Sequence, residues 1–156
     1  MNAIIREARP EDFEDVFVLV RELRDHFGDG HKPIDDEVVR ETYRRFLDHE
    51  DQYIYVAEVE KGKVAGMLNM SIVDSLYENR PSAYIDLLIV NSGYRGKGLG
   101  RMLLDKAFAR AVERDCCEIG VDTTNDNDGA IGFYRAYGFD HSNIMFEKEL
   151  DAGGDA

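Results

Sequence analysis

A glycine-rich segment, residues 95–101, carries the clearest chemical signal in this chain of 156 residues. It places Gly96, Gly98 and Gly100 between an apolar run, residues 84–90, and a stretch of helical periodicity that begins at Leu99. Free backbone N–H groups and the positive end of the helix dipole meet at a helix N-terminus, where they bind phosphate without a dedicated side chain. Glycine tolerates positive φ and lets the backbone approach an anion closely. The segment therefore predicts a loop that binds a diphosphate.

The spacing of the glycines argues against two better-known phosphate loops. A Walker loop needs four residues between its first glycine and a Gly-Lys pair that Ser or Thr follows, whereas only two separate Gly93 from Gly96-Lys97 here. A dinucleotide-binding fingerprint needs glycine at the position of Arg101. A strand-to-helix turn without a ligand remains the alternative.

The charge of the chain limits the classes of partner. Nineteen Lys and Arg against 32 Asp and Glu give a net charge of −13, which opposes nucleic-acid binding. The acidity either solvates the surface, reflects a salty cytoplasm or attracts a cationic substrate such as an amine. No apolar run approaches the ~20 residues of a membrane span, and we expect neither a signal peptide nor a membrane partner.

The cysteines and histidines predict no metal site. Cys116 and Cys117 are adjacent, cannot easily bridge each other, and indicate a reducing, cytoplasmic location. The four histidines, at positions 26, 31, 49 and 141, lack the spacing of metal ligands.

Hydrophobic periodicity predicts the elements that position the loop. We expect helices over residues 10–27, from about 35 to 47, from 99 to about 115 and over 130–137. Asp35 and Asp36 can cap the second helix, the Asn and Asp side chains of residues 125–128 can cap the last one, and Gly138 ends it. Strands are expected over residues 3–8, 53–60, 63–73, 83–90, 118–123 and 142–150, with a hairpin turn at Lys61-Gly62. Residues 28–33 could form a substrate lid, the loops 28–34 and 74–82 would shape an acceptor site, and residues 151–156 read as a disordered tail.

This order of elements, with RGKGLG at residues 95–100 and NDGAIGFYRAYGF at residues 127–139, resembles the GNAT superfamily of acyl-CoA-dependent N-acyltransferases. The resemblance spans essentially the whole chain. It implies a mixed α/β (α+β) fold with a mostly antiparallel central sheet in the order β-α-α-β-β-β-α-β-α-β. It also implies an acyl-CoA cleft between splayed central strands and a single domain over residues 1–150.

The resemblance assigns the cofactor contacts by position. The strand end Leu88-Ile89-Val90 would lie along the pantetheine arm and donate a backbone N–H to the thioester carbonyl. Asn127 matches an asparagine that contacts the cofactor, and Tyr134 matches a tyrosine that protonates the departing thiolate, a role that a phenol can perform. The cofactor-binding loop comprises Arg95, Gly96, Lys97, Gly98, Leu99, Gly100 and Arg101.

Two aspartates are candidates for the general base. Asp86 lies on the strand before the glycine loop, and Asp122 lies five residues before Asn127, where some members carry a catalytic glutamate. Many relatives have a second acid at the position of Leu87, which this chain lacks. Water, or the substrate itself, is the third possibility for accepting the proton.

The sequence thus predicts an N-acetyltransferase that moves an acetyl group from acetyl-CoA to a primary amine of a small molecule or protein, by direct attack in a ternary complex. The first alternative is a regulatory module that binds acyl-CoA without turnover. The second alternative is a nucleotide-binding protein that uses the glycine loop. The expected partner is an amine, cationic if the charge steers it. The resemblance also allows a homodimer.

Overall fold

The computed structural model describes residues 2–27 and 33–150, and the chain divides into two compact units, Met1–Asp122 and Thr123–Ala156. The suggested lid lies almost entirely outside the described residues, as does the tail 151–156. Each unit is described by itself.

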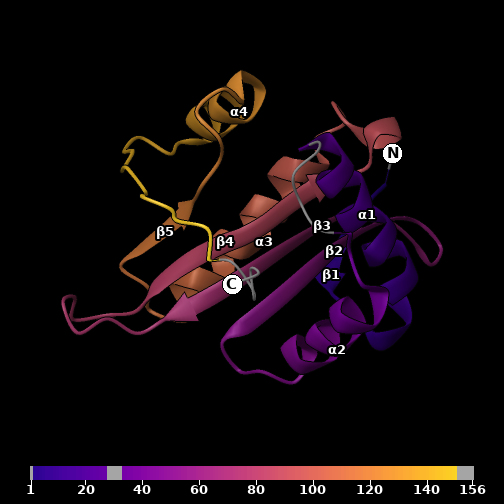
Figure 1. The fold of residues 1–156 in the computed structure, drawn as a ribbon, viewed down its shortest axis with the longest axis horizontal. Helices are drawn as coiled ribbons and strands as arrows, with labels where there is room; N and C mark the ends of the chain where they lie inside the picture. Colours follow the sequence, from indigo (N-terminus) through magenta and orange to yellow (C-terminus); the bar gives the residue numbers. More distant parts are fainter. Residues whose placement is uncertain (1, 28–32, 151–156) are drawn as a thin grey trace, which may run out of the picture. The chain divides into compact units, whose positions relative to one another are not determined.

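The first unit contains a five-stranded sheet in the order β1-β2-β3-β4-β5 (Figure 1). Its antiparallel pairs join β1 to β2, β2 to β3 and β3 to β4, whereas β4 and β5 run parallel. The prediction of a mixed, mostly antiparallel sheet is confirmed. The strands are β1 (Ile4–Glu7), β2 (Gln52–Glu60), β3 (Lys63–Val73), β4 (Ser82–Val90) and β5 (Glu118–Val121).

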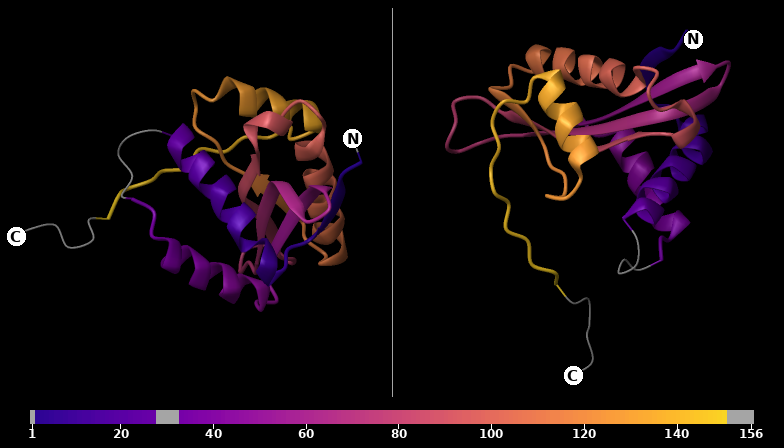
Figure 2. Two further views of the ribbon diagram at one scale, coloured as in Figure 1. Left: turned by 90° about the vertical axis from the view of Figure 1, so that its right-hand side faces the viewer. Right: turned by 90° about the horizontal axis from the view of Figure 1, so that it is seen from above.

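Helices cover both faces of this sheet (Figure 2). The helices α1 (Phe13–His26) and α2 (Asp36–Leu47) pack on one face, and α3 (Leu99–Glu113) packs on the other. The side chain of Asp35 caps α2 by accepting hydrogen bonds from the backbone N–H groups of Glu37 and Val38, as its position in the sequence predicts. β4 ends at Val90 and α3 begins at Leu99, so a 3₁₀ turn over Ser92–Tyr94 and the glycine loop connect the strand to the N-terminus of the helix.

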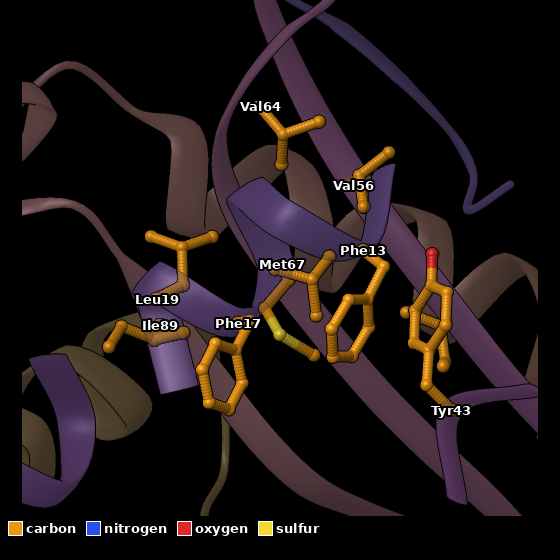
Figure 3. Close-up of a cluster of buried hydrophobic side chains, with 10 residues drawn as sticks. Phe13, Phe17, Leu19, Tyr43, Val56, Val64, Met67 and Ile89 are labelled. Carbon is orange, nitrogen blue, oxygen red and sulfur yellow. The ribbon is translucent and has the colours of Figure 1, made fainter. Parts of the chain in front are cut away.

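The core between α1, α2 and the sheet is built from aromatic and branched side chains (Figure 3). Phe13 and Phe17 stack with their ring centroids 5.5 Å apart, and the Tyr43 ring lies 5.4 Å from Phe13. Met67 of β3 and Ile89 of β4 meet them from the sheet. Burial of each such side chain contributes about 1.5–3 kcal/mol, so the apolar stripe of α1 holds this helix against β3 and β4.

A part-buried ion pair fixes the chain just before α1. Arg6 donates two hydrogen bonds of 2.8 Å to the two carboxylate oxygens of Asp12, and the Arg9 backbone N–H donates a third of 2.7 Å. Burial raises the pKa of Asp12, but these hydrogen bonds outweigh it and hold the pKa below its usual value. The predicted helix 10–27 therefore begins as a 3₁₀ turn over Pro10–Asp12 and becomes α-helical at Phe13.

The second unit contains α4 (Asp128–Tyr137), which begins two residues before the predicted range 130–137 and ends at the predicted residue. Asn127 Oδ1 accepts a hydrogen bond of 3.1 Å from the backbone N–H of Ala130, and Gly138 ends the helix with φ of +125°.

The predicted final strand over residues 142–150 is wrong, because residues 139–150 form no helix or strand. Ile144, Phe146 and Leu150 are exposed there instead. A β-branched and aromatic pattern favours extended backbone, but a strand exists only where another strand pairs with its N–H and C=O groups. The described elements therefore run in the order β-α-α-β-β-β-α-β-α.

Candidate functional site

The glycine loop joins β4 to α3 in a conformation that glycine makes possible. Gly96 has φ of +73° and Gly98 has φ of +84°, values in the left-handed region that other residues seldom adopt. A Cβ atom at either position would meet nothing within 4 Å. The backbone conformation, and not crowding, requires glycine here.

The N-terminus of α3 presents backbone donors suited to an anion. Gly98 is its capping residue and provides no side-chain cap. The first N–H groups of a helix, here those of Leu99, Gly100 and Arg101, have no acceptor within the helix. These donors and the positive end of the helix dipole together favour a phosphate group. Leu99 is itself buried, so it can offer a ligand only its backbone.

The cationic side chains of the loop have partners within the protein. Arg95 donates from Nε to the Val90 carbonyl at 3.0 Å and from its terminal nitrogen to Glu22 at 3.2 Å. Lys97 Nζ lies 3.4 Å from the Gly93 carbonyl oxygen and 5.0 Å from the centroid of the Tyr94 ring. Backbone N–H groups are therefore the stronger candidates for direct contact with a diphosphate.

The end of β4 has a neighbouring strand on one side only. The pairing of β4 with β5 runs from Ser82 to Ile85, whereas the pairing with β3 continues to Val90. Alternate N–H and C=O groups of residues 86–90 consequently point away from β3 without a β5 partner in the sheet. Ile89 is buried in the core, so its contribution to a ligand would come from its backbone, while Leu88 and Val90 are half-buried.

A β-bulge places Asp86 at the point where β4 loses contact with β5. Met70 pairs with Ile85 and Asn69 with Leu87, so Asp86 has no opposite residue on β3. Bulges redirect a side chain and are frequent beside active sites. The bulge also puts Leu87 on the face of the core around α1.

The carboxylate of Asp86 has an altered proton affinity. Desolvation raises its pKa, the negative charge of Asp122 raises it further, and a hydrogen bond of 2.9 Å from Ser71 Oγ acts in the opposite direction. The net pKa of Asp86 lies above its usual value, which suits a group that must take up a proton. Asp86 nevertheless keeps a solvent-exposed side chain, as does Asp122, which follows β5 directly.

The remaining predicted site residues belong to the second unit. The Asn127 side-chain oxygen is occupied by its helix cap, which leaves its amide nitrogen available for another contact. Tyr134 is half-buried between aromatic rings, with its centroid 5.3 Å from that of Phe133 and 5.5 Å from that of Phe139. The structure thus places Asp86, Asp122 and the glycine loop in the first unit, and Asn127 and Tyr134 in the second.

Two residues of this region were not predicted from the sequence. Glu22 of α1 contacts the loop after β4, and Ser71 of β3 binds Asp86. In the sequence, these residues are only a carboxylate and a hydroxyl on amphipathic elements. Such residues are typical of any solvent-facing position, so the sequence does not mark them as part of a site.

Among the described residues, no group of three or more His, Cys, Asp or Glu side chains is arranged to hold a metal ion. Over the same ranges, every helix is too short or too polar to cross a membrane.

The model of the acetyltransferase (GNAT) family matches residues 2–139 of this chain. Among solved structures, a transcriptional regulator from Bacillus halodurans C-125 is 26% identical, with a TM-score of 0.83 over 96% of this chain and 100% of its own. Glucosamine-6-phosphate N-acetyltransferase from Arabidopsis thaliana is 22% identical, with a TM-score of 0.79 over 97% and 100% of the two chains. An aminoglycoside acetyltransferase from an uncultured soil metagenomic sample is 23% identical, with a TM-score of 0.78 over 96% and 97%.

Proposed function

The chain belongs to the GNAT acetyltransferase family, and we propose that it transfers an acetyl group from acetyl-CoA to a primary amine of a small molecule or protein. The amine attacks the thioester directly while both substrates are bound in a ternary complex.

The observation that carries this proposal is the N-terminus of α3, which lacks a side-chain cap, after the end of β4 that pairs with β3 but not with β5. Gly96 and Gly98 hold the loop with positive φ, and Gly98 leaves the helix N-terminus without a side-chain cap. The donors of residues 96–101 fit a diphosphate, and the backbone of residues 88–90 fits an extended amide-containing arm. A backbone N–H at this strand end would stabilise the negative charge that develops on the thioester oxygen.

The proton of the attacking amine requires an acceptor. We assign this role to Asp86, directly or through one water, because its carboxylate lies on the bulge where β4 and β5 separate and its pKa is raised. Asp122 is the second candidate, since it lies at the end of β5, five residues before Asn127. The amine loses one proton and the leaving thiolate gains one, so the protons balance. Tyr134 donates the proton that the thiolate gains. Asn127 completes the cofactor contacts through its amide nitrogen.

The proposal extends to a cationic acceptor. A net charge of −13 raises the rate of encounter with positive ligands, and one structural relative is an aminoglycoside acetyltransferase. Polyamines, aminoglycoside-like amines and lysine-rich peptides are the acceptors of this class. Exposed charge is screened over a Debye length of about 8 Å at physiological ionic strength, so added salt should slow these reactions.

A panel of amines incubated with acetyl-CoA tests the proposal. We expect release of free thiol in step with the appearance of a product heavier by one acetyl group, detected by mass spectrometry, and faster for cationic than for neutral or anionic amines. Faster reaction of neutral or anionic amines, independent of salt, would refute the cationic acceptor while leaving acetyl transfer intact.

A regulatory module that binds acyl-CoA without turnover is the second candidate, because one relative of similar fold is a transcriptional regulator. Tight binding of acetyl-CoA without thiol release for any amine of the panel would favour this candidate. Binding of NAD or ATP in preference to acetyl-CoA would contradict both.

The proposal requires residues 1–150 to act as one catalytic domain, because the glycine loop and Tyr134 contribute to one reaction. It assumes a reducing cytoplasm, in keeping with the free thiols of Cys116 and Cys117.

A further inference from the structure

Glu22, on α1, binds the segment that leads from β4 into the glycine loop. Its Oε1 accepts hydrogen bonds from the Ser92 backbone N–H at 2.9 Å and from the Arg95 guanidinium at 3.2 Å. Its Oε2 accepts one from the Asn91 side-chain amide at 3.1 Å. The Glu22 side chain is only 24% exposed, so these partners largely replace water around the carboxylate. We call these four residues the Glu22 clamp.

The residues that Glu22 holds also fix the rest of the turn. The Asn91 backbone N–H donates to the Ala65 carbonyl at 2.8 Å, and the Asn91 side-chain oxygen accepts from the Gly93 N–H at 3.0 Å. Arg95 returns to the end of β4 through its hydrogen bond to the Val90 carbonyl. Loss of the carboxylate would leave three donors without their acceptor, immediately before the first glycine of the loop.

The charge of Glu22 is unfavourable for an anion site by itself. A carboxylate near a diphosphate repels it, and Arg95, its one cationic partner in the clamp, offsets only part of that repulsion. A role in attracting the diphosphate would need the opposite sign of charge. The carboxylate is therefore explained by the geometry that it imposes on the loop.

We propose that Glu22 is a positioning residue for cofactor binding, which holds residues 91–95 so that the N–H groups of residues 96–101 face the diphosphate of acetyl-CoA. This inference rests on the proposed function, since it concerns the same cofactor loop. It identifies a contribution of α1 to the diphosphate site that the glycine motif does not contain.

The test compares two ligands with the same thioester, acetyl-CoA and S-acetylpantetheine, of which only the first carries the diphosphate. Calorimetric titration should show that Glu22→Ala weakens acetyl-CoA binding roughly tenfold, the equivalent of about one hydrogen bond to a charged group. Binding of S-acetylpantetheine should stay within about twofold of the wild type. A role in overall folding alone would change both affinities together.

Two further variants separate geometry from charge. In Glu22→Gln the amide oxygen can still accept from Ser92 and Arg95, but its nitrogen faces the Asn91 amide, so we expect a loss smaller than that of Glu22→Ala. Glu14→Ala removes one negative charge from the same helix and serves as the control. The Glu14 side chain is 75% exposed and pairs with Arg40 instead of the clamp. This control should leave both affinities unchanged. Should Glu22→Ala fail to fold, the near-isosteric Gln variant keeps the test decisive.

The outcomes distinguish the clamp from the proposed function. If the Glu22 variants bind acetyl-CoA as tightly as the wild type or more tightly, the positioning role of the clamp is overturned and the proposed acetyl transfer is unaffected. The same conclusion follows if the variants lose equal affinity for acetyl-CoA and S-acetylpantetheine. A wild-type protein that does not bind acetyl-CoA overturns the proposed function and the clamp with it.

Discussion

Replacement of Gly98 by valine tests whether the loop conformation creates the cofactor site. Gly98 has φ of +84° and ψ of 3°, which lies in the left-handed region. An L-residue in that region costs about 1–2 kcal/mol, and a β-branched residue is among the least tolerated there. The native loop conformation is therefore strained in Gly98→Val, even though a Cβ atom would meet no neighbour within 4 Å.

The strain should appear in the affinity for acetyl-CoA. If the loop relaxes out of the left-handed region, its N–H groups leave the positions that face the diphosphate, and binding must restore the strained form. If the loop keeps its shape, the isopropyl group occupies the open space in which the anion approaches. A cost of about 1.4 kcal/mol corresponds to a factor of ten in the dissociation constant, so we expect acetyl-CoA to bind about tenfold more weakly, or worse.

Gly62 provides a matched control in the turn between β2 and β3. Its φ is +79°, and a Cβ atom there would also meet nothing within 4 Å. Gly62→Val should therefore lower the free energy of unfolding by about 1–2 kcal/mol, measured by urea denaturation, without changing the affinity for acetyl-CoA. Calorimetry on the two folded variants makes the comparison. Unchanged affinity in Gly98→Val, or an equal loss in Gly62→Val, would refute the assignment of the cofactor site to this loop.

Three other predictions address catalysis and stability. Tyr134→Phe should lower turnover by about 10²–10⁴-fold with acetyl-CoA affinity nearly intact, whereas Tyr137→Phe should change neither turnover nor affinity. If Tyr134→Phe keeps full turnover under conditions where chemistry limits the rate, another group must donate the proton to the thiolate. Because the Ser71 hydrogen bond lowers the pKa of Asp86, Ser71→Ala should move the acidic limb of the pH profile of kcat/KM to higher pH, and Asp86→Asn should flatten it. A limb that neither variant alters would exclude Asp86 as the base. Asp12→Asn should lower the free energy of unfolding at neutral pH by about 1–3 kcal/mol, because it removes the charge of a part-buried ion pair in which Arg6 keeps its second partner, Glu58. The pKa of Asp12 is lowered in the folded state, so its contribution to the free energy of unfolding is complete above the unfolded pKa of about 3.9 and is lost as the pH falls through the folded pKa. If urea denaturation shows the variant to be destabilised equally at pH 7 and in strong acid, this reasoning is contradicted.

Local signals in the sequence were sufficient for the parts of the fold that form within a few residues. Asp35 and Asn127 cap the helices that they precede, and Gly98 begins α3 as its spacing predicts. The family motif likewise identified the GNAT fold, which the match over residues 2–139 confirms. These features are predictable because a cap, a positive φ and a helix N-terminus depend on residues one to four positions apart.

The features that required the tertiary structure all depend on a distant partner. The bulge at Asp86 exists because of the register of β4 against β3, which a period-two pattern cannot reveal. The segment 142–150 has the composition of a strand, yet it forms none in the absence of a paired neighbour. Glu22 reaches the loop after β4 across about 70 positions of the chain, and its polar side chain resembles any exposed glutamate until packing of α1 on the sheet brings the two together. The sequence alone therefore determined which backbone groups could bind an anion. The packing of α1 against β3 and β4 decided that Glu22 holds the segment before those groups. Residues so far apart in the chain come into contact only after the core has formed.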